Sequence, residues 1–177
     1  MTTLYNIKDC LQDLPEIMEM IYQEWGQFFK KPAEQKKQEI TNAINSKCDF
    51  PQIYVIKQNN IVIGGFIIKD KDLENCDLSP WVACVVVKKE YRGKGYGRQL
   101  LLHLEQVCNL YPQIYLFTTL KNFYEKIGFE YIKDINHNGE INKLYIRKTK
   151  VWSWKYNNIM IYCIWKTIAS QKRGKNG

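Results

Sequence analysis

An uninterrupted apolar run from Trp81 to Val87 is followed, within ten residues, by three glycines at alternating positions. Such a run is typical of a β-strand that is buried on both faces. Gly93, Gly95 and Gly97 lead into residues 97–109, where apolar side chains recur at helical spacing and predict an amphipathic helix. The chain must therefore pass from a buried strand through a tight turn into a helix, which is an arrangement of α/β proteins.

The glycine-rich turn has the chemistry of an anion-binding site. Glycine lets the backbone curl so that several N–H groups point at one spot, and the N-terminus of the following helix adds a partial positive charge. Arg92 and Lys94 add full charges beside it. The spacing fits neither the dinucleotide fingerprint nor the phosphate loop of nucleoside triphosphatases. From this segment alone, a phosphate-binding turn and a tight turn without a ligand both remain open.

The rest of the chain alternates between strand-like and helix-like stretches. Gly64 and Gly65 interrupt one apolar stretch and predict a bulge or a close approach of two backbones. The pattern favours an α/β fold with a mixed sheet and helices on both faces. We predict strands at residues 4–7, 53–57, 61–69, 81–87, 114–117, 129–134, 144–147 and 159–165, and helices at 14–25, 32–45, 97–109 and 121–127.

Composition and charge describe a soluble protein. The 177 residues, 45% hydrophobic and 25% charged, suffice for one domain with a buried core. The apolar runs are too short to span a bilayer, and the acidic residues near the start argue against a signal peptide. Six scattered cysteines favour a reduced, cytoplasmic protein. The net charge of +8 arises entirely after residue 120, and a solvated basic surface is favoured over a nucleic-acid site.

Two segments of the chain match the motif pair of a known family. Residues 92–97, Arg-Gly-Lys-Gly-Tyr-Gly, match Arg/Gln-x-x-Gly-x-Gly/Ala, and residues 122–129 resemble Phe-Tyr-x-Lys-x-Gly-Phe. Residues 24–26 and 77–83 also resemble a bacterial subset of that family. On these motifs the chain resembles the GCN5-related N-acetyltransferase (GNAT) superfamily over residues 1–134.

The resemblance implies a small, single-domain, bacterial-type GNAT member. Its α/β fold is expected to hold a mixed, mostly antiparallel, twisted sheet of six to seven strands, with helices on both faces and the fourth and fifth strands splayed apart. The pantetheine arm of acetyl-CoA is expected to lie in that gap and pair with the fourth strand. The residues implied to bind acetyl-CoA are Val85, Val86, Val87, Arg92, Gly93, Lys94, Gly95, Tyr96, Gly97 and Thr118.

The resemblance also assigns catalytic roles. A protonated amine is not nucleophilic, so the site must accept a proton before the amine attacks the thioester. Tyr124 is implied to be the general acid that protonates the departing thiolate, and the N–H of Val85 to stabilise the oxyanion. Glu24 is the candidate base, with Asp77 and Ser79 as alternatives that are also ordinary cap or turn residues.

The acceptor is expected to approach from the side opposite the cofactor. Trp25, Trp152 and Trp154 are the candidate substrate-binding residues, although the last two could equally cover an exposed end of the core. Neither His103 nor His137 has a partner at metal-ligand spacing, so we predict no metal.

Several functional hypotheses follow. The main one is an N-acetyltransferase that moves the acetyl group of acetyl-CoA to a primary amine of a small molecule or peptide, by direct attack in a ternary complex. A toxin-like acetyltransferase acting on aminoacyl-tRNA and a non-enzymatic acetyl-CoA-binding module remain alternatives. We expect no membrane or nucleic-acid partner, and a monomer or homodimer. Residues 1–170 are assigned to one domain, with 135–158 as an insertion or extended hairpin and 171–177 as a flexible basic tail.

Overall fold

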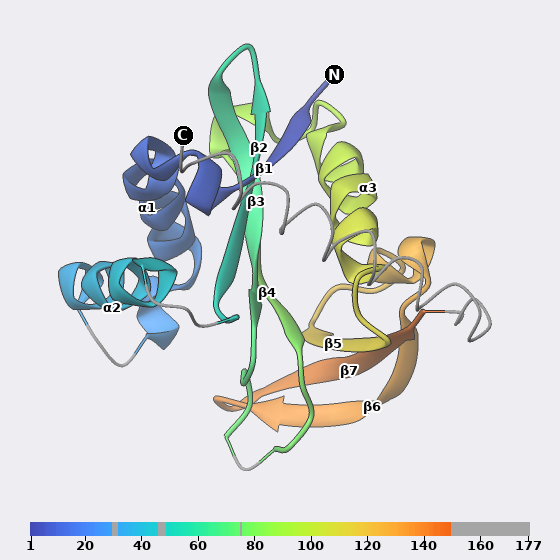
Figure 1. The fold of residues 1–177 in the computed structure, drawn as a ribbon. Coiled ribbons are helices and arrows are strands. Elements are labelled where there is room, and N and C mark those ends of the chain that lie inside the picture. Colours follow the sequence, from blue (N-terminus) through green and yellow to red (C-terminus); the bar gives the residue numbers. More distant parts are fainter. Residues whose placement is uncertain (30–31, 46–48, 75, 150–177) are drawn as a thin grey trace, which may run out of the picture.

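The computed structural model describes residues 1–29, 32–45, 49–74 and 76–149, in which seven strands form one sheet in the order β1-β2-β3-β4-β5-β7-β6 (Figure 1). Neighbouring strands are antiparallel except for the parallel pair β4 and β5. This confirms the predicted mixed, mostly antiparallel sheet. The strands are β1 Thr3–Asn6, β2 Gln52–Gln58, β3 Ile61–Lys69, β4 Trp81–Val87, β5 Gln113–Thr118, β6 Glu130–His137 and β7 Glu140–Lys148.

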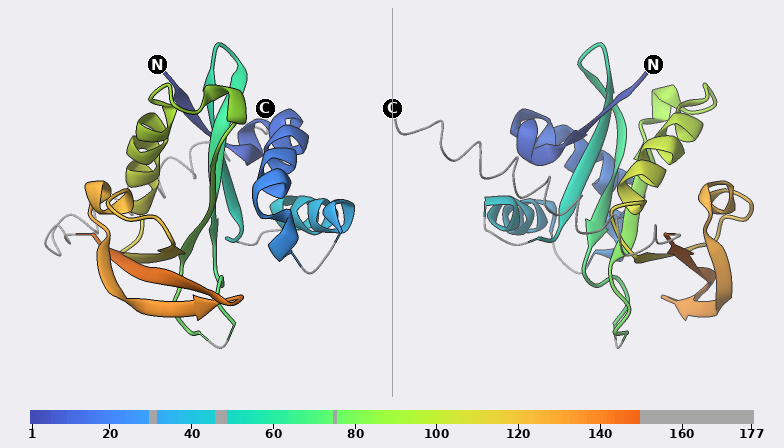
Figure 2. Two further views of the ribbon diagram at one scale, coloured as in Figure 1. Left: turned by 180° about the vertical axis from the view of Figure 1, so that it is seen from behind. Right: turned by 45° about the vertical axis from the view of Figure 1, so that its right-hand side comes forward.

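Helices cover both faces of the sheet. Helices α1 (Leu14–Trp25) and α2 (Ala33–Asn45) lie on one face and α3 (Tyr96–Cys108) on the other (Figures 1 and 2). Short 3-10 turns lie between these elements: η1 Ile7–Asp9, η2 Leu11–Asp13, η3 Gly26–Phe28, η4 Lys89–Tyr91 and η5 Tyr124–Ile127. Together these elements form the helix-covered sheet that the alternation of patterns predicts.

The helical faces that the sequence predicts are the faces that pack on the sheet. Helix α1 has Pro15 in its first turn, where no intrahelical N–H is needed, and buries Ile17 and Ile21. Helix α3 buries Leu100 and Leu104 on the opposite face. A third apolar cluster, around Trp81 and two aromatic neighbours, lies where β4 meets β5.

The expected close approach of backbones at Gly64 and Gly65 is confirmed. A Cβ built on Gly64 would lie 2.3 Å from the carbonyl oxygen of Val86, and one on Gly65 would lie 2.2 Å from that of Tyr54. Real Cβ atoms do not approach carbonyl oxygens so closely, so only glycine lets β2, β3 and β4 pair at this level.

The end of the sheet differs from the sequence-based prediction. Strands β6 and β7 are longer than predicted and form a hairpin whose turn has positive φ at Asn138 (54°) and Gly139 (84°). Asn-Gly is the standard sequence signal for such a turn, and it lies inside residues 135–158, where we expected an insertion or an extended hairpin. The predicted strand at 159–165 lies outside the described residues; here β7 is the strand that separates β5 from β6.

The predicted helix at 121–127 was wrong in extent. Only residues Tyr124–Ile127 are helical, as the 3-10 turn η5. The reason is Asn122, whose φ of 56° is left-handed and cannot continue a right-handed helix. Gly128 then ends the turn with a φ of 83°.

Candidate functional site

Strands β4 and β5 separate soon after they meet. One residue pair, Trp81 with Tyr115, joins them in the parallel ladder. Further along, the register between β3 and β4 shifts, so that Cys84 and Val85 of β4 together lie opposite Phe66 of β3. Cys84 has a φ of 52°, the left-handed conformation that marks this bulge. The bulge turns β4 away from β5 and confirms the predicted splay.

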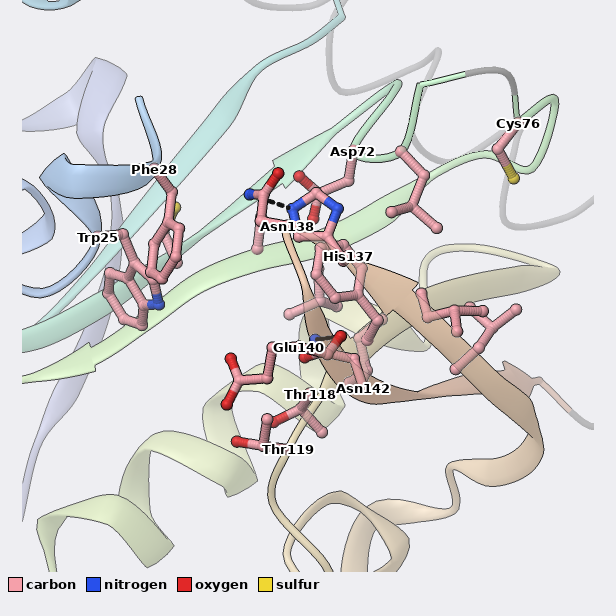
Figure 3. A pocket seen from close by; sticks show the side chains of 18 of the residues that line it. Trp25, Phe28, Asp72, Cys76, Thr118, Thr119, His137, Asn138, Glu140 and Asn142 are labelled. Atoms are coloured by element: carbon pink, nitrogen blue, oxygen red, sulfur yellow. Dashed lines mark hydrogen bonds between the residues drawn. The ribbon is translucent and has the colours of Figure 1, made fainter. Parts of the chain in front are cut away.

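A cleft of about 940 Å³ occupies the gap between the splayed strands (Figure 3). Its walls come from β4 (82–85), β5 (116–118), the 3-10 turn η3, the β3–β4 loop and the β6–β7 hairpin. Val85 and Thr118, two of the predicted acetyl-CoA contacts, both line it. The hydroxyl of Thr118 accepts a hydrogen bond from the N–H of Leu120 at 3.1 Å, which fixes the end of β5.

Tyr124 lines the same cleft from the η5 turn. The side chain is 7% exposed, and its ring makes edge-to-face contacts with Phe123 and Phe129. Burial raises the pKa of the Tyr124 phenol well above its usual value, so the group stays protonated at neutral pH. Its hydroxyl has no hydrogen-bond partner among the described residues, which leaves it able to donate to a bound molecule.

Strand β7 holds the turn that carries Tyr124. The hydroxyl of Tyr145 donates a 2.8 Å hydrogen bond to the carboxylate of Glu125, the next residue after Tyr124. The Nε–H of Arg147 donates to the carbonyl of Ile127 at 2.7 Å, at the other end of the turn. Because both anchors come from one strand, the position of Tyr124 is set by the long-range register of the sheet.

The glycine-rich turn ends in the N-terminus of α3, as predicted. Gly93 and Gly95 have φ of 73° and 84°, and a Cβ built on either meets nothing within 4 Å. The amides of Arg98 and Gln99 point back to the carbonyl of Gly95, so the preceding N–H groups lie at the open end of the helix. The turn is therefore open at the N-terminus of α3, where backbone N–H groups favour an anion.

Two tyrosines brace this turn. The hydroxyl of Tyr96 donates to Gln58 Oε1 at 2.8 Å, and its ring packs edge-on against Tyr91 at 5.5 Å between centroids. The ammonium of Lys94 lies 5.8 Å from the centre of the Tyr91 ring. Tyr96 therefore supports the turn with its side chain, which the motif alone does not indicate.

The structure brings two predicted site residues, Arg92 and Glu24, into direct contact. The guanidinium of Arg92 donates to the Glu24 carboxylate at 2.5 Å and to the carbonyl of Val87 at 2.8 Å. Both side chains line a second depression of about 330 Å³ between α1 and the end of β4, which Val86 also lines. Glu24 is thus engaged with Arg92, and it is not among the residues that line the cleft.

The cleft also contains residues that the sequence analysis did not assign. Trp25, a candidate substrate-binding residue, lines the cleft beside Phe28 from η3, and His137 and Glu140 face it from the β6–β7 hairpin (Figure 3). The Asn138-Gly139 turn could have indicated that this hairpin returns to the sheet. Trp152 and Trp154 lie outside the described residues. Among the described residues, no group of three or more side chains is arranged to hold a metal ion, and no helix is long and apolar enough to span a membrane.

The fold is that of the GNAT acetyltransferases. The structure resembles a Vibrio cholerae spermidine N-acetyltransferase chimera (TM-score 0.63, 17% identity, 84% of this chain and 95% of that one). It also resembles the ribosomal-protein-S18-alanine N-acetyltransferase of Escherichia coli (TM-score 0.59, 18% identity, 88% of this chain and 98% of that one). A third similar structure is a Salmonella typhimurium protein that is described as an acetyltransferase and was solved with acetyl-CoA (TM-score 0.62, 15% identity, 86% of this chain and 96% of that one). At these identities the likeness establishes the fold.

The central region of the chain also matches a family model in sequence. Residues 49–131 match the family model "Acetyltransferase (GNAT) domain", which spans β2 to the start of β6 and includes the glycine turn and Tyr124. No curated protein sequence gives a significant match. Residues 49–131 are thus similar in sequence to GNAT acetyltransferase domains, and the described chain shares their fold.

Proposed function

We propose that this enzyme transfers the acetyl group of acetyl-CoA to a primary amine of a small molecule or peptide, by direct attack in a ternary complex. The observation that carries the proposal is a cleft between the splayed strands β4 and β5 that is lined by the buried, protonated Tyr124. The open glycine turn that begins α3 follows β4 in the chain.

The chain offers acetyl-CoA a continuous set of contacts. The open amides at Gly95 and at the start of α3 suit the pyrophosphate, because a helix N-terminus favours an anion. The edge of β4 that faces β5 suits the pantetheine amides at Val85, since the ladder between these two strands holds one pair, Trp81 with Tyr115. When bound, acetyl-CoA supplies the activated acetyl group. The chain's own residues orient the acetyl group and accept or donate the protons.

The acceptor side suits a cationic amine. Trp25 and Phe28 offer aromatic faces, and Asp72 and Glu140 place carboxylates on the same cleft. The named activities of two structural neighbours, on spermidine and on a ribosomal-protein alanine, are consistent with an amine acceptor. We also propose that the protein is cytoplasmic and is a monomer or homodimer.

Two experiments test the proposal. Acetyl-CoA should bind to the purified protein in calorimetry, and coenzyme A should be released when a panel of polyamines, amino-sugar amines and peptides with free N-termini is added. Binding without turnover on any amine would favour the non-enzymatic alternative. Turnover only with aminoacyl-tRNA would favour the toxin-like one.

A matched pair of glycine variants locates the cofactor site. Gly95 and Gly139 both have a φ of 84° with nothing within 4 Å of a built Cβ, so an aspartate strains the backbone equally at each. Gly95→Asp also puts a carboxylate where the phosphates are proposed to lie, and should weaken acetyl-CoA binding by more than ~10-fold, or about 1.4 kcal/mol. Gly139→Asp, in the β6–β7 turn, should bind as the wild type does. Equal affinities in two folded variants would refute this site.

A further inference from the structure

The proposed reaction needs a group that takes a proton from the amine, and the side chain best placed for it is His137. The chain has two histidines. His103 lies on α3, where it is hydrogen-bonded to Thr2, and it does not line the cleft. His137 is the last residue of β6 and lines the cleft (Figure 3). We propose that the imidazole of His137 is the general base that deprotonates the acceptor amine. This inference rests on the proposed function.

The position of His137 is set by its backbone and by a ring contact. The following turn is held by the amide of Gly139, which donates to the side chain of Asn136 at 3.1 Å. The imidazole packs on the ring of Phe117 with 4.7 Å between centroids. Phe117 precedes Thr118 at the end of β5, so the imidazole lies beside the mouth of the β4–β5 gap, where the thioester is proposed to lie.

His137 and the proposed acid line the same cleft from different apolar clusters. Tyr124 packs in the cluster beneath α3, whereas Phe117 and Ile135, which are neighbours of His137, belong to the cluster around Trp81. An acid and a base on different walls of one cleft suit a reaction in which the thiolate leaves toward one group and the amine arrives beside the other.

The side chain of Asn138 contacts the imidazole of His137. The Nε2 atom of His137 lies 3.1 Å from the amide nitrogen of Asn138, which can only donate. Nε2 accepts this hydrogen bond in the tautomer that carries its proton on Nδ1. When Nε2 takes up a proton, the amide of Asn138 can turn over and accept from it with its oxygen.

Charged groups of both signs surround the imidazole in the cleft. Lys133 and Glu140 lie on its own hairpin, Lys69, Asp72 and Glu74 on the β3–β4 side, and Glu39 on α2. Lys69 and Asp72 form an ion pair with each other. Imidazoles as a class are stronger bases than carboxylates, which favours His137 over the neighbouring carboxylates as the general base.

The proton balance of the step closes without a further reactant. The ammonium gives one proton to the imidazole, and its nitrogen bonds to the thioester carbon. The carbon–sulfur bond breaks, and Tyr124 donates its proton to the departing thiolate. The second proton lost by the nitrogen restores the phenol, and the imidazolium returns its own proton to solvent. The products are an amide, free coenzyme A and one proton.

The test is the pH dependence of a His137→Gln variant. At pH 7 its kcat/KM for the amine should be ~10²-fold below the wild type, the usual weight of a general base, with the Kd for acetyl-CoA unchanged. The rate should climb tenfold for each pH unit toward the pKa of the amine, because the free amine needs no base. In a His137→Ala variant, added imidazole should restore part of the rate.

The control is His103→Gln, which removes the other imidazole of the chain. This variant should keep the wild-type pH profile, whereas the rate of the His137 variants should keep rising up to the pKa of the amine. The proposal is overturned if His137→Gln and His137→Ala, both folded by circular dichroism, keep the wild-type pH profile and the wild-type rate at pH 7. Absence of amine acetylation in the wild-type protein would instead refute the proposed function.

Discussion

Replacing Tyr124 with phenylalanine removes one oxygen atom from a side chain that is 7% exposed. The ring contacts with Phe123 and Phe129 do not involve that oxygen, and the hydroxyl has no partner among the described residues, so no hydrogen bond of the described fold is lost. The free energy of unfolding should therefore change by less than ~1 kcal/mol. Acetyl-CoA affinity should change little for the same reason.

Turnover should respond very differently. If the phenol protonates the thiolate, kcat should fall ~10²-fold or more, equivalent to about 2.7 kcal/mol of barrier. This change in kcat is measured from the rate of coenzyme A release, which a thiol reagent detects at saturating amine and acetyl-CoA. Because burial raises the pKa of Tyr124, the wild-type enzyme should show no loss of this acid below the usual phenol pKa of about 10.

Tyr145→Phe is the matched control, since it removes the same atom from the neighbouring tyrosine that bonds Glu125 at 2.8 Å. A hydrogen bond to a charged group contributes about 1.5–3 kcal/mol, so this variant should melt at a temperature lower by about 3–12 °C. Its kcat should fall less than that of Tyr124→Phe. Wild-type kcat in a folded Tyr124→Phe protein would refute the acid role and leave Tyr124 as a packing residue.

Three further outcomes test the fold and the acceptor site. Gly64→Ala, whose Cβ would lie 2.3 Å from the carbonyl oxygen of Val86, should lower the free energy of unfolding by about 3 kcal/mol or more, whereas Gly97→Ala, 3.9 Å from Phe123, should not; urea unfolding compares them. Burial raises the pKa of Cys108 from 9.0 to about 12, so between these values the folded chain holds a proton that the unfolded chain has lost. Stability should therefore fall as the pH rises, by up to about 1.4 kcal/mol per pH unit, and Cys108→Ala should make that slope shallower. Replacing both Trp152 and Trp154 with alanine should raise the KM of the amine and leave acetyl-CoA binding intact; a lower melting temperature with unchanged kinetics would place both in the core.

Much of the fold could be predicted because its signals are local. The apolar run of β4 and the periodic faces of α1 and α3 reflect the side on which each element is buried, which depends on spacing alone. The prediction failed at residues 121–127 and at the last strands for identifiable reasons. A single left-handed residue, Asn122, excludes a longer helix there, and the turn at Asn138 and Gly139 defines the β6–β7 hairpin.

The sequence by itself determined the fold class and the location of the glycine turn that we propose binds an anion. Both depend on short segments, and the glycines of residues 93–97 act through backbone conformations that need no distant partner. Tertiary structure alone decided which side chains share the site. It pairs Glu24 with Arg92 across 68 residues and places His137 on Phe117 beside the open edge of β4. Such contacts depend on the register and twist of the whole sheet, which no local pattern specifies.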